Sequence, residues 1–179
     1  MSRVYYLLSL YYYNWLCMEQ CYNQIASRIN QSLQLLSGEP IMIYTQTIQF
    51  DSEGNWYSLN ITEQVRNIVV QSGIRNGMVL VFSQHTTGSV LIIEHEAGFL
   101  VDLEDTMERL IPSDGLYAHH LREYDRNGAS HVRTAIMPPS ITVPLVDGDL
   151  FLGEYQDILV VDMQPDKKQR SVLIQVMGE

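Results

Sequence analysis

Short runs of alternating or continuous apolar residues dominate the chain from about residue 41 onward. Residues 41–50 alternate between apolar and polar side chains, which is the pattern of a half-buried strand. Residues 78–84 are almost continuously apolar, which is typical of a buried strand. We expect the turn at residues 165–168 to form the last hairpin. The same reasoning predicts further strands over residues 89–93, 132–137, 141–145, 150–152, 158–163 and 171–177.

Two segments between these strands carry apolar residues at helical spacing. The first follows Asn60, which has Glu63 three residues on as in a capping box, and it ends before Gly73. The second is predicted over residues 97–110, because Pro112 cannot continue a helix. Two helices among about seven strands predict an α+β domain with a mostly antiparallel, sandwich-like sheet core.

The first 41 residues differ in pattern from the rest of the chain. Residues 4–18 are apolar and rich in tyrosine, but they are shorter than the roughly 20 residues of a membrane span and lack a small-residue cleavage site. Apolar side chains at helical spacing over residues 22–36 predict an amphipathic helix. We expect residues 1–41 to be an N-terminal extension, or a start assigned too early, and residues 42–179 to form the domain.

Charge and cysteine content exclude several classes of protein. The formal net charge is −10, so neither nucleic acid nor an anionic membrane is an expected partner. Apolar residues make up 46% of the 179 residues, which is the composition of a globular chain. Cys17 and Cys21 lack the second pair that a zinc ribbon needs. Two free thiols fit a reducing compartment, and we expect the protein in the cytoplasm.

Three histidines are the main candidates for chemistry. His85 follows the predicted buried strand, His119 lies in a long polar stretch, and His131 follows that stretch. Imidazole nitrogens are good ligands for Zn²⁺, and three of them leave a fourth position open for water or substrate. The alternative also stays open, because an isolated histidine is more often a hydrogen-bonded structural residue.

A hydroxyl-rich turn is predicted between two of the strands. It contains Thr86, Thr87 and Ser89 around a glycine, and hydroxyls with backbone N–H groups in such a turn can bind a phosphate. Arg133 and Arg170 are candidate phosphate ligands, because a guanidinium makes bidentate contacts with that group. Either arginine is equally well explained as a surface residue.

Glu94 and Asp102 are the candidate acidic groups for catalysis. A carboxylate at either position can orient a histidine through its second ring nitrogen or act as a general base. Glu94 ends an apolar strand, so we expect it to be buried with a partner. Asp102 is also explained as a residue early in a helix, where the helix dipole favours a carboxylate.

Several motifs occur together and in a fixed order. His85-Thr86-Thr87 is followed by an apolar run that ends in Glu94, and Asp102-Leu103 lies in the next predicted helix. The later motifs are Ile111-Pro112, Tyr117-Ala118-His119, His131-Val132, residues 140–145, Gly148, Leu152-Gly153, Gln156, Ile158, Arg170 and Gly178. This ordered set resembles the YjbQ family, the secondary thiamine-phosphate synthases, over most of the chain after residue 42.

The resemblance implies an enzyme that joins a pyrimidine pyrophosphate to a thiazole phosphate and releases pyrophosphate. It implies that His85, His119 and His131 correspond to the family's histidines and hold a divalent metal such as Zn²⁺ or Mg²⁺. Gln156, in the Gly-x-x-Gln motif, is then expected to be a polar contact in the pocket. A homotrimer with the pocket near a subunit interface is also implied, together with a small phosphorylated substrate.

Three departures from the family pattern lie in or near its motifs, so the resemblance supports the fold better than the activity, and the loss of the Thr-Trp pair favours an alternative function. Ile93 stands where the family usually has Asn, Pro138-Pro139 replaces a Gly, and Glu154-Tyr155 replaces Thr-Trp. The carboxylate of Glu154 weakens phosphate binding unless a cation neutralises it. One alternative is a non-catalytic metal- or small-ligand-binding trimer on the same fold. The other is a structural or interaction module whose histidines are merely buried.

Overall fold

The computed structural model describes residues 18, 22–29, 40–121 and 125–179. Contacts divide the chain into two units, Met1–Pro40 and Ile41–Glu179. In the first unit, residues 22–29 are helical and expose Tyr22, Ile25 and Ile29. Both cysteines and the apolar segment before residue 18 lie outside the described residues. Within the described part, no helix has the length and apolar character needed to cross a membrane.

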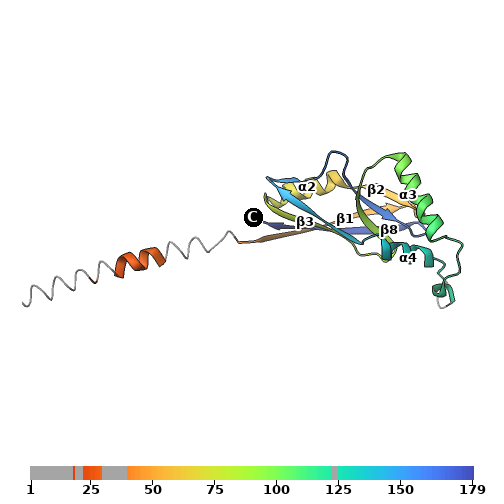
Figure 1. Ribbon diagram of the computed structural model, residues 1–179, viewed down its shortest axis with the longest axis horizontal. Coiled ribbons are helices and arrows are strands. Elements are labelled where there is room, and N and C mark those ends of the chain that lie inside the picture. The colour runs from red at the N-terminus through yellow and green to blue at the C-terminus, as the bar shows by residue number, and fades with distance from the viewer. Residues whose placement is uncertain (1–17, 19–21, 30–39, 122–124) are drawn as a thin grey trace, which may run out of the picture. The chain divides into compact units, whose positions relative to one another are not determined.

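The described residues of the second unit form eight strands and four short or medium-length helices, whose arrangement is seen in Figure 1. The strands are β1 (Met42–Ser52), β2 (Tyr57–Asn60), β3 (Gly77–Ser83), β4 (Gly88–Ile93), β5 (Ser140–Val146), β6 (Asp149–Leu150), β7 (Asp157–Asp162) and β8 (Lys168–Gly178). The helices are α2 (Thr62–Ser72), α3 (Ala97–Leu110), the 3₁₀ helix η1 (Ala118–Leu121) and α4 (Gly128–Ile136). The predicted α+β class is therefore confirmed.

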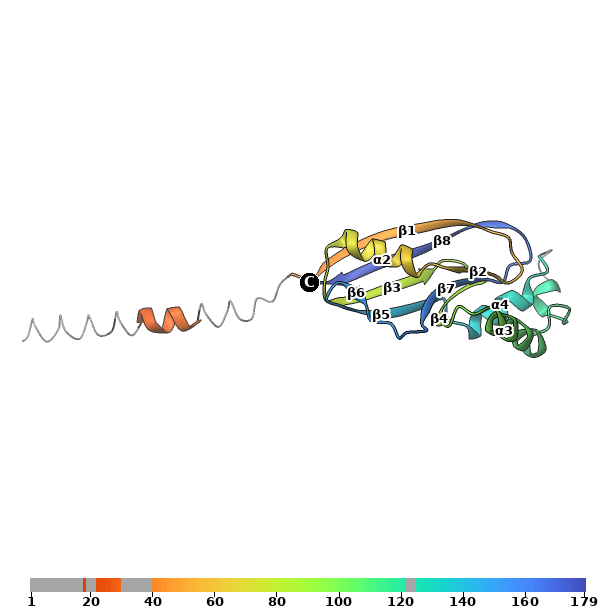
Figure 2. The same cartoon turned by 90° about the horizontal axis from the view of Figure 1, so that it is seen from above.

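The strands form two antiparallel sheets. The larger sheet has five strands in the order β1-β8-β3-β5-β6, and the smaller has three in the order β2-β7-β4. Figures 1 and 2 both place α2 toward one end of the sheets and α3 and α4 toward the other. This arrangement gives the sandwich-like core that the strand pattern predicts.

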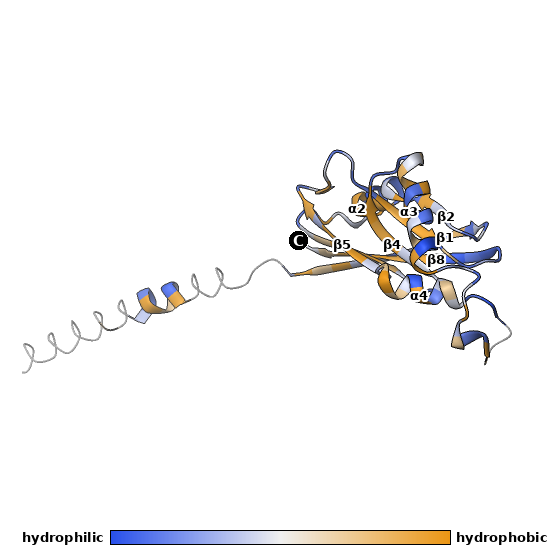
Figure 3. Ribbon diagram, turned by 45° about the vertical axis from the view of Figure 1, so that its right-hand side comes forward, coloured by the Kyte–Doolittle hydropathy of each residue, from blue (hydrophilic) through white to orange (hydrophobic). Residues whose placement is uncertain are grey.

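Two clusters of apolar side chains hold the elements together. The first lies between the sheets and under α2, and it includes Val90, Val160 and Ile174. The second packs the other side of the smaller sheet against α3 and α4 through Met107 and Val161. Figure 3 shows β4 and β5 as largely apolar strands. Each fully buried aliphatic side chain contributes about 1.5–3 kcal/mol relative to an exposed one.

Helix α3 begins and ends where the sequence predicts. Glu96 precedes it, and its carboxylate accepts hydrogen bonds from the N–H groups of Gly98 and Phe99, both at 2.8 Å. These two bonds lower the pKa of the Glu96 carboxyl group. Pro112 follows the last turn and cannot extend the helix. Local sequence signals are therefore sufficient to set both ends of α3.

The start of α2 differs in detail from the predicted capping box. The Asn60 side chain accepts a hydrogen bond from the Thr62 N–H at 3.0 Å. Glu63 does not close the box but lies 3.5 Å from the guanidinium of Arg66. Gly73 ends the helix at a φ of 70°, in the left-handed conformation that glycine adopts readily. Asn60 and Gly73 thus mark this helix as predicted, without the contribution expected of Glu63.

The predicted strand over residues 132–137 is wrong, because these residues belong to α4 and its C-terminal end. The buried side of this helix carries Ser130, Arg133 and Thr134 beside Ala129. A search for apolar residues at helical spacing misses a helix whose buried positions carry polar side chains. The few apolar residues that remain then resemble a short strand.

The predicted hairpin at residues 165–168 is also wrong in its pairing. β7 pairs with β2 and β4 in the smaller sheet, whereas β8 pairs with β1 and β3 in the larger sheet. The turn therefore carries the chain from one sheet to the other. This crossing brings Asp162, at the end of β7, opposite Arg170, near the start of β8. β2 is a further strand that the sequence pattern does not predict.

Candidate functional site

A pocket of about 390 Å³ lies between the end of β3 and helix α4. Its walls include Phe82, His85, His131, Thr134 and Pro139. Apolar walls with a few polar groups are the usual composition of sites for small organic molecules. We call this cavity the histidine pocket.

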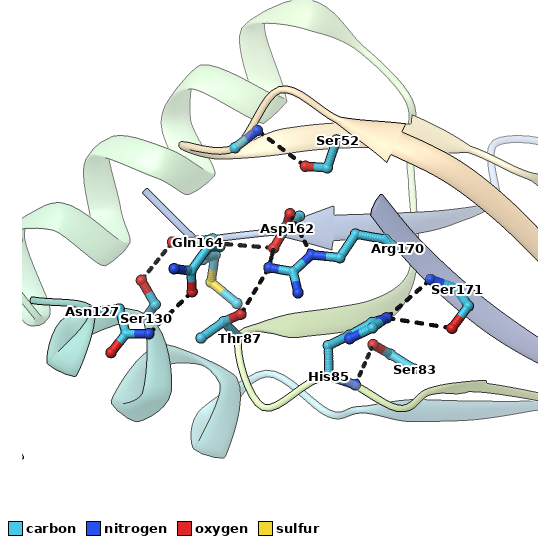
Figure 4. A network of polar contacts seen from close by, with 12 residues as sticks. Ser52, Ser83, His85, Thr87, Asn127, Ser130, Asp162, Gln164, Arg170 and Ser171 are labelled. Carbon is cyan, nitrogen blue, oxygen red and sulfur yellow. Dashed lines mark hydrogen bonds and ion pairs between the residues drawn. The ribbon is translucent and has the colours of Figure 1, made fainter. Parts of the chain in front are cut away.

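His85 is held in the pocket wall by the neighbouring strand β8. Its Nε2 accepts the N–H of Ser171 at 2.9 Å, and the backbone N–H of His85 donates to the Ser83 hydroxyl at 3.4 Å (Figure 4). Because Nε2 is an acceptor, the proton of the neutral ring is on Nδ1. Burial lowers the pKa of His85, the charge of Arg170 lowers it further, and the charge of Asp162 offsets part of this effect. His85 is therefore neutral at pH 7, with Nδ1–H as a donor.

His131 and His119 form a second group of imidazoles. The ring centroids are 4.8 Å apart, with His119 on η1 and His131 in the first turn of α4. His120 has a different role, because its Nε2 accepts the N–H of Gly128 at 3.1 Å and so holds the start of α4. The structure thus places His131 in the same pocket as His85, and His119 next to His131.

The predicted three-histidine metal site is not assembled by the described residues of a single chain. Among them, no three His, Cys, Asp or Glu side chains are grouped as ligands of one ion. The Nε2 of His85 is also occupied by its bond to Ser171. His119 and His131 remain as a pair, and two imidazoles are fewer than the three protein ligands usual in a catalytic zinc site. The residues of one chain therefore do not fit this metal site.

Arg170 is buried between the sheets. Its guanidinium donates to both carboxylate oxygens of Asp162 at 2.8 Å, and to the hydroxyl of Thr87 at 3.1 Å (Figure 4). The arginine side chain is 8% exposed and that of Asp162 is 2% exposed. Bidentate pairing of this kind is strong and directional, so it fixes β7 against β8. Arg170 and Thr87 are therefore part of the internal framework.

Arg133 is also buried, on the other side of the smaller sheet. Its side chain is 2% exposed, forms an ion pair with Glu108, and donates from Nε to the carbonyl of Ile111 at 3.0 Å. Its guanidinium carbon lies 5.2 Å from the ring centroid of Trp56. Burial raises the pKa of Glu108, but hydrogen bonds from Ser113 and the charge of Arg133 outweigh this and lower it overall. Arg133 thus ties α4 to α3 and is not a lining residue of the histidine pocket.

The predicted acidic and amide groups lie away from the pocket. Glu94 directly follows the last residue pair of the β4–β7 ladder, and Gln156 directly precedes it. Glu94 is exposed, which contradicts the expectation that it is buried, and Asp102 is exposed on α3. The Gln156 side chain accepts the N–H of Gly153 at 2.8 Å and so braces its own loop. The lining of the histidine pocket includes none of these three predicted residues.

Strand β4 separates the two groups of predicted residues. It has six residues, which span roughly 17 Å at the usual rise per residue. Thr86 lines the histidine pocket just before β4 begins. Ser89, at its start, is buried and donates to the carbonyl of Met137 at 2.9 Å. Within a single chain, the histidines and hydroxyls lie near the start of β4, whereas the Glu94 carboxylate lies near its end.

The structure adds two polar residues that the sequence analysis does not single out. Thr134 lines the histidine pocket and is 7% exposed, and its hydroxyl has no hydrogen-bond partner among the described residues. Asp162 is the buried partner of Arg170. A carboxylate within the apolar run of residues 158–163 is a signal for such a partner, because an unpaired buried charge is costly. Thr134 has no comparable signal.

Comparison with known proteins identifies the family. Residues 46–179 match the family described as UPF0047 protein YjbQ-like. The chain belongs to this family. A UPF0047 protein of Methanothermobacter thermautotrophicus is 33% identical over 137 residues, which cover 76% of this chain and 94% of the relative. A UPF0047 protein of Mycobacterium bovis is 43% identical over 97 residues, which cover 54% of this chain and 74% of the relative.

Two solved structures share the fold of this chain. A YbjQ-like protein of unknown function from Sulfolobus solfataricus P2 matches with a TM-score of 0.75 at 26% identity, covering 78% of this chain and all of the other. A hypothetical protein from Aeropyrum pernix K1 has a TM-score of 0.70 at 30% identity, with 76% and 99% covered. The matched region contains both ends of β4, so the resemblance inferred from the ordered motifs is confirmed at the level of family and fold.

Proposed function

We propose that this UPF0047 protein binds a small phosphorylated molecule in the histidine pocket and joins a pyrimidine pyrophosphate to a thiazole phosphate. The pocket volume is in the range of sites for small organic molecules, and its apolar walls suit a heterocycle. The observation that carries the proposal is the Thr134 hydroxyl, which is buried in the pocket wall without a partner among the described residues. An unsatisfied buried hydroxyl costs about 1–3 kcal/mol, and a ligand that bonds to it removes this cost.

The imidazoles supply the chemistry in this proposal. Departing diphosphate gains negative charge, which hydrogen-bond donors and cations stabilise. His85 offers Nδ1–H as a neutral donor, and the imidazole rings of His131 and His119 carry further N–H donors. The arginines take no part, since both are buried and each is bound to a carboxylate of the same chain.

The test is formation of thiamine phosphate from the two substrates, with wild type beside His131→Ala and His95→Ala. His95 is an exposed histidine outside the pocket and serves as the matched control. We expect the rate to fall about 100-fold in His131→Ala, the size of a lost acid–base group, and to stay unchanged in His95→Ala. No product from wild type, with magnesium or zinc added, contradicts the proposed reaction.

The predicted divalent metal is a separate proposal. Elemental analysis of the purified protein after incubation with zinc measures it directly, with His131→Ala and His119→Ala for comparison. Because one chain brings only His119 and His131 together, the proposed metal requires a further ligand from a second copy, and we expect bound metal that is lost in both variants. Wild type without metal contradicts the proposal and leaves the reaction test unaffected.

A second candidate function is binding of a small ligand without turnover. The burial of Arg133 and Arg170 favours it, because neither guanidinium is available to a phosphate in the pocket. Calorimetric titration with thiazole phosphate separates the two functions. Binding that Thr134→Val weakens, without product formation, supports the second function over the first.

We also propose that the protein is a homotrimer, as the family resemblance implies. Large apolar side chains are exposed on the outer face of the larger sheet, including Ile43, Met78 and Phe82, and on α4 at Ile136. Burying them between copies removes apolar surface from water. Light scattering should give three times the chain mass of 20.6 kDa. A mass of one chain contradicts the proposal.

A further inference from the structure

The helix at residues 22–29 carries its large apolar side chains on one side (Figure 3). Tyr22, Ile25 and Ile29 are separated by three and four positions, and Met18 continues this spacing in the sequence. These four side chains are 54–73% exposed. A helix of this length is only marginally stable in water without tertiary contacts. Its apolar side therefore requires a partner.

The same spacing extends through the sequence on both sides of this helix. Alternating steps of four and three residues lead from Val4 to Leu36, and only Ser32 among the ten positions is polar. The positions are Val4, Leu8, Tyr11, Trp15, Met18, Tyr22, Ile25, Ile29, Ser32 and Leu36. Apolar residues at alternating steps of three and four are the a and d positions of a coiled coil. A repeat sustained over this many heptads is typical of helices that pair along their length.

We propose that the apolar side of residues 22–29 packs against the same side of a second copy of the chain, in a coiled coil formed by the N-terminal extension. The family match begins at residue 46, and the relative from Sulfolobus solfataricus matches 78% of this chain with its whole length. The contact thus belongs to a segment outside the region shared with the family. It goes beyond the proposed ligand site and does not depend on it.

The whole repeat supplies enough apolar surface for a stable contact. One buried apolar side chain removes roughly 100 Å² from water, so the four described side chains supply roughly 400 Å². A standard interface buries about 800 Å² per partner. The nine apolar positions of the repeat together supply roughly 900 Å². A second copy carries the same repeat and therefore matches this surface over its full length.

Charge does not oppose the approach of two copies along this segment. The formal net charge of the chain is −10, but the charged side chains from Val4 to Leu36 are Glu19 and Arg28 alone, which have opposite signs. Repulsion between copies therefore arises mainly from the rest of the chain. The segment also lacks the many Lys and Arg residues of helices that bind anionic lipid. A second copy is thus a better partner for this helix than a charged membrane surface.

Cross-linking of the full chain tests the contact. In a Cys17→Ser/Cys21→Ser background, Ile25→Cys places a thiol on the apolar side of the helix, and Ser27→Cys places one on the polar side, also at an exposed position. Paired helix axes lie about 8–10 Å apart, so a short bismaleimide reaches between thiols on facing sides but not between thiols on outer sides. We expect several times more covalent dimer from Ile25→Cys than from Ser27→Cys. Equal yields overturn the proposal.

The comparison of these two variants also separates this contact from the proposed homotrimer. Association through residues 42–179 brings both variants together to the same extent, so it does not create a difference between their yields. A difference in yield therefore reports the helix contact alone. The failure of either idea leaves the other unaffected.

Hydrogen exchange tests the contact without added thiols. Ile25→Asn with Ile29→Asn removes the apolar side, so we expect amide exchange within residues 22–29 to become about 100-fold faster, as two isoleucines lose their burial. Asn23→Ala with Ser27→Ala changes the polar side and should retain slow exchange. Mass spectrometry of peptides from the full chain measures both. Fast exchange in the wild type overturns the proposal.

An uncharged lipid surface is the alternative partner for the apolar side. Flotation with phosphatidylcholine vesicles distinguishes it from a second copy, and we expect the full chain to stay in the aqueous fraction. Flotation that Ile25→Asn with Ile29→Asn abolishes, together with equal cross-linking yields, assigns the apolar side to lipid and overturns the proposal.

Discussion

The buried Arg170 and the pocket residue Thr134 differ in whether their polar groups have hydrogen-bond partners among the described residues. Arg170 lies between the sheets and donates to both oxygens of Asp162 and to Thr87. The Thr134 hydroxyl, in the wall of the histidine pocket, has no partner among the described residues. The sequence alone makes Arg170 a candidate phosphate ligand, but the structure assigns it to the framework. A buried charge needs its partner inside the chain, whereas a hydroxyl in a pocket can obtain its partner from a ligand.

The largest expected effect is loss of the interior ion pair. Arg170→Met leaves Asp162 buried without its counter-ion, so we expect the free energy of unfolding to fall by about 3–5 kcal/mol. Urea denaturation of the full chain measures the change. Arg75→Met is the matched control, because Arg75 is 68% exposed and lies 3.9 Å from Asp147, itself 85% exposed. Its effect should stay below about 1 kcal/mol.

A double variant determines whether the loss comes from the orphaned carboxylate. Arg170→Met together with Asp162→Leu removes both charges, and apolar pairs often replace buried ion pairs with little loss. We expect the double variant to recover most of the lost stability. If it is less stable than Arg170→Met alone, the hydrogen bonds to Thr87 and within the turn matter more than the charge.

The second arginine should be less critical than the first. In Arg133→Met, the partner Glu108 is 44% exposed and regains water, but the carbonyl of Ile111 loses its donor. We therefore expect a loss of about 1–3 kcal/mol in the free energy of unfolding, smaller than for Arg170→Met. A loss as large as that of Arg170→Met contradicts the idea that exposure of the partner sets the difference.

Local patterns predict those parts of the fold whose buried positions are apolar. The bounds of α3 follow from its apolar stripe and from Pro112, and most strands follow from their alternation. The apolar pattern does not predict α4, because Ser130, Arg133 and Thr134 occupy the buried side of this helix. The passage of the chain between the sheets at residues 165–168 is not predicted either, because a turn sequence does not show to which sheet the next strand belongs.

The candidate site is only partly predictable for a related reason. The ordered motifs identify His85, His119 and His131, and the structure places His85 and His131 in one pocket. They also identify Glu94 and Gln156, which lie at the opposite end of β4. The order of motifs along the chain does not show how far apart the folded strands place them. That separation depends on strand register, which sets Glu94 and Gln156 side by side at one end of the β4–β7 ladder.

A smaller effect is expected from the titration of His85. Its pKa is lowered in the folded protein, while the unfolded chain takes up a proton near pH 6.5. Unfolding therefore binds a proton as the pH falls below about 6.5, and stability declines from that pH toward the lower folded pKa. His85→Gln retains an acceptor for the Ser171 N–H but cannot titrate, so its stability should depend less on pH over this window. Urea denaturation at several pH values measures the difference, and an unchanged pH dependence in His85→Gln contradicts the assignment to His85.

The smallest expected change in stability is at Thr134. Thr134→Val keeps the shape of the side chain and removes a buried hydroxyl that has no partner among the described residues, so the free energy of unfolding should stay constant or rise by about 1 kcal/mol. Affinity for thiazole phosphate should fall by about 5-fold, the value of one hydrogen bond. Thr142→Val, at an exposed position on β5, is the control and should change neither quantity. A clear loss of stability without a loss of affinity would mean that the hydroxyl is part of the framework, and Thr134 would then resemble Arg170.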